Sequence, residues 1–200
     1  MKQRGRIVAV AAWMLVAPFG VAGLARADTL IDQSVLDGIR GWLDSPVVQT
    51  TLLARQKEVS AYTQKEIDAW DKRWRAERDQ QDQPLVASVM ASPLSTYLLR
   101  IQAMSTGLYT EIILMDAKGL NAGLSSISSD YWQGDEAKFQ KTFDVGADAV
   151  FVDEPEHNDK TGTDRVQVNL TIPDSAGAPL GAVAVEVNLT ELARRRALGL

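Results

Sequence analysis

The chain has 200 residues, of which 46% are hydrophobic, 21 are basic, 26 are acidic and none is cysteine, and its net charge is −5. A chain of this length and composition can bury an ordinary core as one domain, which excludes a small scaffold held together by disulfide bonds. Non-specific nucleic-acid binding depends on Lys and Arg that displace counterions from phosphates, so this acidic chain is not expected to bind nucleic acid.

The first 27 residues have the layout of a secretory signal peptide. They carry four basic side chains and no acidic one, an apolar run follows the charged start at 7–24, and Ala25-Arg26-Ala27 has the form of a cleavage site. We therefore expect export, cleavage after Ala27 and a periplasmic location, which suits a chain without cysteine. Cleavage would leave 17 basic and 26 acidic residues, a net charge of −9. The alternative is a retained membrane anchor, because the apolar run is just long enough to span a bilayer.

Residues 28–105 are predicted to be helical, because apolar residues recur there at helical spacing and several helix starts are marked. Ser45-Pro46 and Ser92-Pro93 each place a capping residue before a proline at the first helical position. Thr63 followed by Glu66 is a capping box, in which each side chain bonds the backbone N–H of the other residue.

The helix that begins after Thr63 carries two tryptophans. Ile67, Trp70 and Trp74 recur at the spacing of one helix face. Such a pair could form a stacking platform for a ligand, but packing against the sheet or against another helix is the favoured interpretation. The polar run 79–83 ends this helix, and Pro84 opens a short one that ends near Ala91.

Residues 106–200 are predicted to form a sheet with one inserted helix and a short helix at the end. Alternating apolar residues and Gly-containing turns indicate the strands. The expected elements are, in order, strand 111–115, a turn at 116–119, an extended piece at 120–124, helix 134–143, strand 149–152, strand 165–172, a turn at 174–177, strand 180–189 and helix 191–198 capped by Thr190.

Four short motifs and the last strand resemble a known family. They are DAKG at 116–119, SDYW at 129–132, DKTG at 159–162, DSAG at 174–177 and GAVAVEVNLTEL at 181–192. Their order and spacing resemble the extracytoplasmic Cache (PDC) sensor domains, whose fold is PAS-like. The resemblance implies an α+β fold in which a helical N-terminal half precedes an antiparallel sheet of about five strands with one inserted pocket helix. We expect 28–200 to form one folded unit.

The resemblance also implies a ligand pocket between the sheet and the inserted helix. Its predicted ligand-binding residues are Tyr131, Trp132, Lys138, Phe139, Asp153 and Met115. Tyr131 and Trp132 offer flat apolar area with a hydrogen-bonding end, although one of them could instead be core and the other a helix cap. Asp153 resembles the position from which relatives hold an ammonium group of the ligand. Members that bind amino acids have an Arg soon after the Asp-Tyr pair, whereas this chain has none, so amino-acid recognition is not transferred.

No catalytic residue, metal ligand or cofactor is predicted. His157 is the single histidine, and the chain has neither a G-x-S-x-G elbow nor a Gly-rich phosphate loop. The acidic segment 153–159 lacks the ligand spacing of a calcium loop and is expected to be solvated. Hydrolysis by a pair of carboxylates stays open as a third alternative, since distances between carboxylates are invisible in a sequence.

These observations favour an exported domain that binds a small organic molecule. Relatives pass ligand binding through flanking membrane helices to a kinase, cyclase or chemotaxis module. The sequence stops at Leu200 without a second membrane span or an output module. We therefore expect no stable membrane anchor after cleavage, and a role as a periplasmic ligand-binding protein or through a membrane sensor or transporter as partner. The alternative is a structural or protein-interaction module whose pocket is vestigial.

Overall fold

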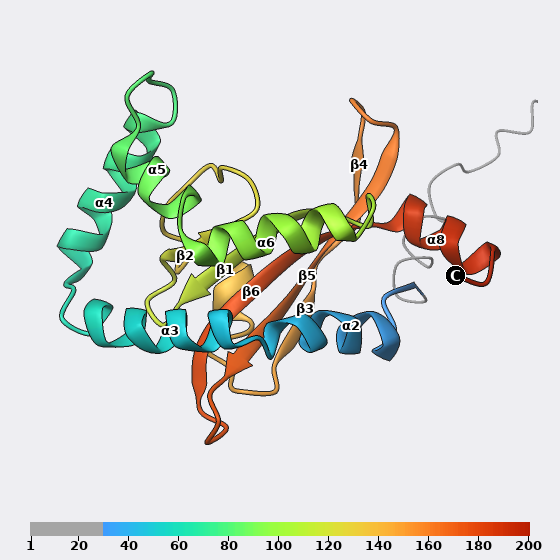
Figure 1. Ribbon diagram of the computed structural model, residues 1–200, viewed down its shortest axis with the longest axis horizontal. Helices are drawn as coiled ribbons and strands as arrows, with labels where there is room; N and C mark the ends of the chain where they lie inside the picture. The colour runs from blue at the N-terminus through green and yellow to red at the C-terminus, as the bar shows by residue number, and fades with distance from the viewer. Residues whose placement is uncertain (1–29) are drawn as a thin grey trace, which may run out of the picture.

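A computed structural model describes residues 30–200, and the predicted signal peptide lies outside this range. Within these residues a series of helices precedes a sheet, and a last short helix follows it (Figure 1). The helices before the sheet are α2 (Gln33–Leu43), α3 (Pro46–Val59), α4 (Gln64–Glu77), α5 (Pro84–Met90) and α6 (Pro93–Met104). Within the described residues, none of the helices combines the length and apolar character that a bilayer span requires.

The predicted helix starts are confirmed. The capping box is formed at α4, with the Thr63 hydroxyl accepting the N–H of Glu66 and the Glu66 carboxylate accepting the N–H of Thr63. Ser92 caps α6 through its side chain, whereas Ser45 occupies the cap position of α3 without a side-chain bond. The start of α5 is held differently, because a Glu77 carboxylate oxygen on α4 accepts its first free N–H groups.

The sheet has six antiparallel strands, which confirms the expected α+β class. Its spatial order is β2-β1-β6-β5-β3, and β4 pairs with the far end of β5. The strands are β1 (Tyr109–Asp116), β2 (Asn121–Leu124), β3 (Val150–Val152), β4 (Glu156–Asn158), β5 (Thr163–Pro173) and β6 (Pro179–Asn188). The short strand β4 was not predicted, since the sequence indicated a solvated loop there.

The two helices of the second half differ from their predicted bounds. The inserted helix α7 is only Ala137–Gln140, because the Thr142 hydroxyl bonds back to the carbonyl of Lys138 and closes the turn. Its expected first residue, Gly134, instead lies against the Trp132 ring, where a Cβ atom would come within 2.4 Å. The last helix, α8 (Leu189–Ala197), begins earlier than expected. Asn188 caps it, and Thr190 accepts the N–H of Asp164 instead.

The first face of the sheet is apolar and covered by helices. Alternate residues of β5 and β6 point to this face, and α2, α3 and α6 pack over it (Figure 1). Its buried members on the strands include Ile112, Leu114, Val166, Val168, Leu170, Ile172, Val183, Val185 and Val187. The predicted alternation of β5 is therefore confirmed.

The second face of the sheet is mixed. Next to β2 it is apolar, with Ile113 and Met115 packed beneath α4 and α5 in a second buried cluster. α4 and α5 project beyond this end of the sheet (Figure 1). Toward β3 the same face becomes polar, because Arg165, Gln167 and Asn169 alternate along β5 with the residues of the first face. The segment that contains α7 lies on this face, with Phe139 in the second cluster.

Candidate functional site

A hollow of about 240 Å³ lies at the polar end of the second face. We call it the α7 hollow, because the first residues of α7 form one of its walls. The segment joining β3 to β4 forms a second wall, and β5 and β6 form the floor. Its lining residues are Glu136, Ala137, Lys138, Asp153, Glu154, Glu156, Arg165, Val166, Gln167 and Glu186.

The two cations of the α7 hollow are already paired within it. The Lys138 ammonium lies 3.1 Å from a carboxylate oxygen of Glu136. The Arg165 guanidinium lies 2.9 Å from the carboxylate of Glu186 on the neighbouring strand. No cation among residues 30–200 pairs with the three carboxylates of the segment 153–156. The hollow therefore carries a negative charge that its own side chains do not balance.

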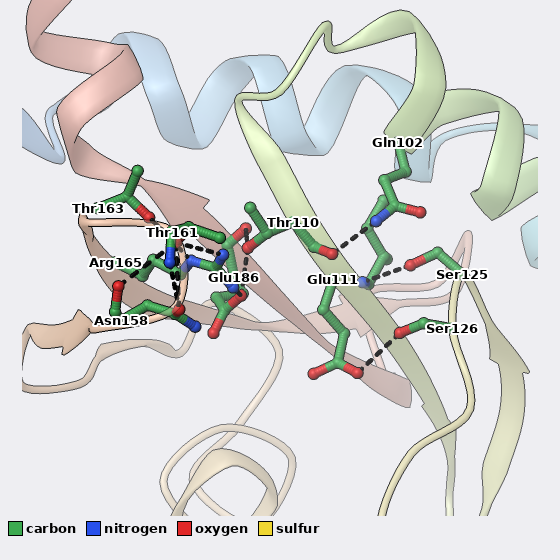
Figure 2. Close-up of polar contacts among 11 residues, drawn as sticks. Gln102, Thr110, Glu111, Ser125, Ser126, Asn158, Thr161, Thr163, Arg165 and Glu186 are labelled. Carbon is green, nitrogen blue, oxygen red and sulfur yellow. Dashed lines mark hydrogen bonds and ion pairs between the residues drawn. The ribbon is translucent and has the colours of Figure 1, made fainter.

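A further, half-buried carboxylate lies beside the floor of the α7 hollow. Glu111 on β1 is the register partner of Glu186 on β6. Figure 2 shows Ser126 donating to Glu111, while Thr110 and Arg165 both bond to Glu186. Burial raises the pKa of the Glu111 carboxyl; the Ser126 hydrogen bond opposes that rise, and the charge of Glu186 adds to it. Negative potential thus extends from the hollow into the sheet.

On the polar side of β5, one buried polar group is only half satisfied. The Asn169 side chain is fully buried on β5, on the same face as Gln167, which lines the hollow. Its amide nitrogen donates to the carbonyl of Phe151 at 3.1 Å, but its oxygen has no donor among residues 30–200. The Thr171 hydroxyl, next on the same face, is also buried and unpaired. An unmet buried acceptor costs about 1–3 kcal/mol.

The structure does not bring the six predicted ligand-binding residues together. Lys138 and Asp153 line the α7 hollow, whereas Tyr131 lines a separate hollow near α3, α4 and α5. Met115 is fully buried and Phe139 nearly so. The Trp132 indole N–H donates to the carbonyl of Lys118. Ligand contact by any of the six stays a prediction.

Tyr131 is held mainly by residues far away in the sequence. Its ring stacks on Trp74 of α4 with centroids 5.3 Å apart, and Trp74 itself is completely buried. The Asp71 carboxylate of α4 accepts the backbone N–H of Tyr131 at 2.9 Å and of Trp132 at 3.1 Å. Arg55 of α3 approaches the Tyr131 hydroxyl while it pairs with the buried Asp116 of the DAKG turn. The favoured packing role is confirmed for Trp74.

Sequence reasoning missed Arg165, Glu186, Asn169 and Asp71. The sequence did contain a signal for Arg165 and Asn169, which both lie on β5. The residues that alternate with the apolar side of this strand are all polar, which is unusual for a face that is covered. Nothing local marked Asp71, because the backbone groups that it binds lie 60 residues further along the chain.

The carboxylates and the histidine do not gather into a metal site in the described part of the chain. Within residues 30–200 no group of three or more His, Asp or Glu side chains is placed to hold a metal ion. The His157 ring lies 2.7 Å from the Asp164 carboxylate on the exposed β4–β5 hairpin. That hydrogen bond raises the pKa of His157 and explains the contact as a surface pair.

Several solved structures are similar to this chain. The ligand-binding domain of the Pseudomonas aeruginosa PAO1 amino acid chemoreceptor PctC, in complex with GABA, has 19% identity and a TM-score of 0.34, and the match covers 82% of this chain and 64% of that one. The ligand-binding domain of the Campylobacter jejuni chemoreceptor Tlp3, in complex with 4-methylisoleucine, has 11% identity and a TM-score of 0.38, over 77% and 65%. The sensor domain of the V. cholerae histidine kinase DctB has 13% identity and a TM-score of 0.33, over 81% and 59%.

These three neighbours are described as ligand-binding or sensor domains. The chain spans less than two thirds of the length of each of them. No protein-family model matches the chain, and no curated protein matches it.

Proposed function

We propose that this chain is an exported sensor-type domain that binds a small organic molecule carrying an amine in the α7 hollow. The observation that carries the proposal is the unbalanced negative charge of the α7 hollow, where the three carboxylates of the segment 153–156 pair with no cation among residues 30–200. An ammonium group would pair with these carboxylates. We assign the ligand one further acceptor, the unpaired side-chain oxygen of Asn169, which lies two residues from Gln167 on the same face of β5.

The charged residues that line the α7 hollow have the following proposed roles. Asp153 and Glu154 attract the ammonium group from the β3–β4 segment, and Glu186 contributes from the floor. Lys138 and Arg165 hold two of the carboxylates in place by their ion pairs. A second polar group of the ligand, such as a hydroxyl or a carbonyl, would meet the amide of Gln167. The ligand would thus be small, polar and positively charged.

Ligand binding would be read out by a partner protein. We propose a periplasmic location after cleavage at Ala27, with a membrane sensor or transporter as the partner, which the leader-like first 27 residues support. The partner, and not a reaction in the α7 hollow, would then pass the signal on.

The test is a thermal-shift titration of the purified chain at fixed low salt, because salt screens charged groups at a rim. The probes are n-butylamine, 1,4-diaminobutane and, as the matched anion, succinate. We expect the amines to raise the Tm and succinate to leave it unchanged. In Asp153→Asn/Glu154→Gln the amine shift should disappear, while Glu58→Gln, outside the α7 hollow, should keep it. An absent amine shift in the wild type, or an equal one in the double variant, would overturn the proposal.

A second function, as an interaction module with a vestigial pocket, is favoured by one observation. Met115, Phe139 and Tyr131, three of the predicted ligand-binding residues, are buried in the second core cluster. In that case Tyr131→Ala would lower stability without changing the affinity for any small probe, and a stable protein partner would co-purify with the chain.

A further inference from the structure

A separate hollow of about 340 Å³ lies where the end of α3 meets α4 and the start of α5. We call it the arm hollow. Tyr131 lies in it, with its hydroxyl beside Arg55 of α3, and Leu85 of α5 contributes apolar surface. Its volume falls within the range of small-molecule pockets in proteins, about 300–1,000 Å³. None of the charged residues of the α7 hollow lines it.

Flat apolar groups make up much of the arm hollow. Tyr62 contributes an aromatic ring from the connection between α3 and α4, Trp70 contributes one from α4, and Pro84 adds its ring at the start of α5. The Arg73 guanidinium lies 5.5 Å from the centre of the Trp70 ring, the geometry of a cation–π contact. A planar ring can lie against such surfaces with little loss of conformational entropy.

The carboxylate oxygens in and beside the arm hollow already accept hydrogen bonds from the protein. One Glu58 oxygen accepts the Tyr62 hydroxyl at 2.7 Å and the other accepts Arg55 at 3.2 Å. The bond to Glu58 raises the pKa of Tyr62 to about 12. Behind Arg73, one Glu77 oxygen accepts its Nε–H and the other accepts the start of α5. Each carboxylate near the hollow is therefore hydrogen-bonded through both oxygens.

Donor groups, in contrast, remain. The two terminal nitrogens of Arg73 have no acceptor among residues 30–200, and Arg73 is about half exposed. The Tyr131 hydroxyl accepts from Arg55 but donates to no described residue. Burial raises the pKa of Tyr131, so its hydroxyl keeps its proton at neutral pH. Because hydrogen-bond donors are left over in the arm hollow, a ligand that carries hydrogen-bond acceptors would fit it best.

We propose that the arm hollow is a second ligand site, which takes a small aromatic carboxylate. The ring would lie between Tyr62 and Trp70, and the carboxylate would accept from the two terminal nitrogens of Arg73, a pairing that planar guanidinium groups favour. The Tyr131 hydroxyl would donate to the same carboxylate or to a ring substituent. This site is independent of amine binding in the α7 hollow.

The test is isothermal titration of the full chain with benzoate, with cyclohexanecarboxylate and benzylamine as matched probes. The first keeps the charge but loses the flat ring, and the second keeps the ring but reverses the charge. We expect benzoate to bind with a millimolar or lower Kd and both matched probes to bind at least about fivefold more weakly, because the first loses the ring stacking and the second loses the charged hydrogen bonds to Arg73. No binding of benzoate, or equal binding of all three, would overturn the proposal.

Variants locate the site. Arg73→Gln should weaken benzoate about tenfold, and Tyr131→Phe severalfold, because each removes a donor. Arg73→Lys keeps the charge beside Glu77 and should recover part of the loss, which separates ligand binding from support of α5. Asp153→Asn, in the α7 hollow, should leave benzoate binding unchanged. Unchanged binding in Arg73→Gln, or an equal loss in Asp153→Asn, would contradict the assignment.

Discussion

The two faces of the sheet are built from the same strands but differ in what their side chains do. On the first face, Val168 and Leu170 of β5 meet apolar residues of β6 under three helices. On the second face, Gln167 and Asn169 of the same strand carry polar groups beneath α7. Polar groups that are buried cost free energy unless they are paired. The first face therefore supplies stability, whereas the second face keeps the polar groups among which we place the proposed ligand site.

The largest expected effect tests the first face. Leu170→Ala removes a side chain that is 1% exposed, so we expect the free energy of unfolding to fall by about 2–5 kcal/mol in urea denaturation. Gln167→Ala, three residues earlier and on the second face, is the matched control and should change it by less than about 1 kcal/mol. Equal losses at the two positions would remove the distinction between the faces.

The second effect tests how α4 holds the second face. Asp71→Ala leaves the buried N–H of Tyr131 without its acceptor, which should cost about 1–3 kcal/mol. Asp71→Asn retains one oxygen acceptor and should cost less. Hydrogen exchange at Tyr131 and Trp132 should accelerate in Asp71→Ala by more than at the amides of β6. A uniform change across the chain would show that Asp71 has no local role there.

The contrast between the faces also explains what the sequence could predict. Helix caps such as Thr63 with Glu66, and turns such as DAKG, depend on residues within four positions of one another, and they are confirmed. The alternation of β5 needs no knowledge of its neighbours, and it placed the first face correctly.

The candidate site was harder to predict because its groups are joined across the fold. Trp74 stacks on Tyr131 and bonds Ser128, contacts that span more than 50 residues. They bury Tyr131, for which the sequence had left both a ligand-binding role and a core role open. The length of α7 was overestimated for a local reason that propensity alone does not show, the bond from Thr142 back to Lys138.

The third prediction separates stability from binding at Asn169. Asn169→Val loses the hydrogen bond to Phe151 but no longer buries an unpaired oxygen, so the free energy of unfolding should change by less than about 1 kcal/mol. The thermal shift with 1,4-diaminobutane should nevertheless disappear. Thr171→Val is the control. It too removes an unpaired buried oxygen, here a hydroxyl, but it leaves Asn169 in place, so it should keep the amine shift. A retained shift in Asn169→Val would exclude that oxygen from the ligand site.

The smallest expected effect is a dependence of stability on pH at Glu111. Its pKa is raised above the ordinary value of 4.5, chiefly by burial, so the folded state holds this proton more tightly than the unfolded state does. Stability is therefore lost as the pH rises from the ordinary pKa through the raised one, and the wild type carries the full penalty above both. Glu111→Gln removes the titration but keeps an oxygen for the Ser126 hydroxyl.

We therefore expect Glu111→Gln to be slightly more stable than the wild type in urea at pH 7, and the difference to vanish below about pH 4. Lys138 and Arg165 lie near enough to favour the ionised form, which keeps the gain small. A bound amine should shrink it further, because an ammonium group in the α7 hollow also stabilises the ionised carboxylate. If Glu111→Gln instead lost stability at pH 7, the carboxylate would be a satisfied structural group, and the second face would resemble the first more closely than its polar residues indicate.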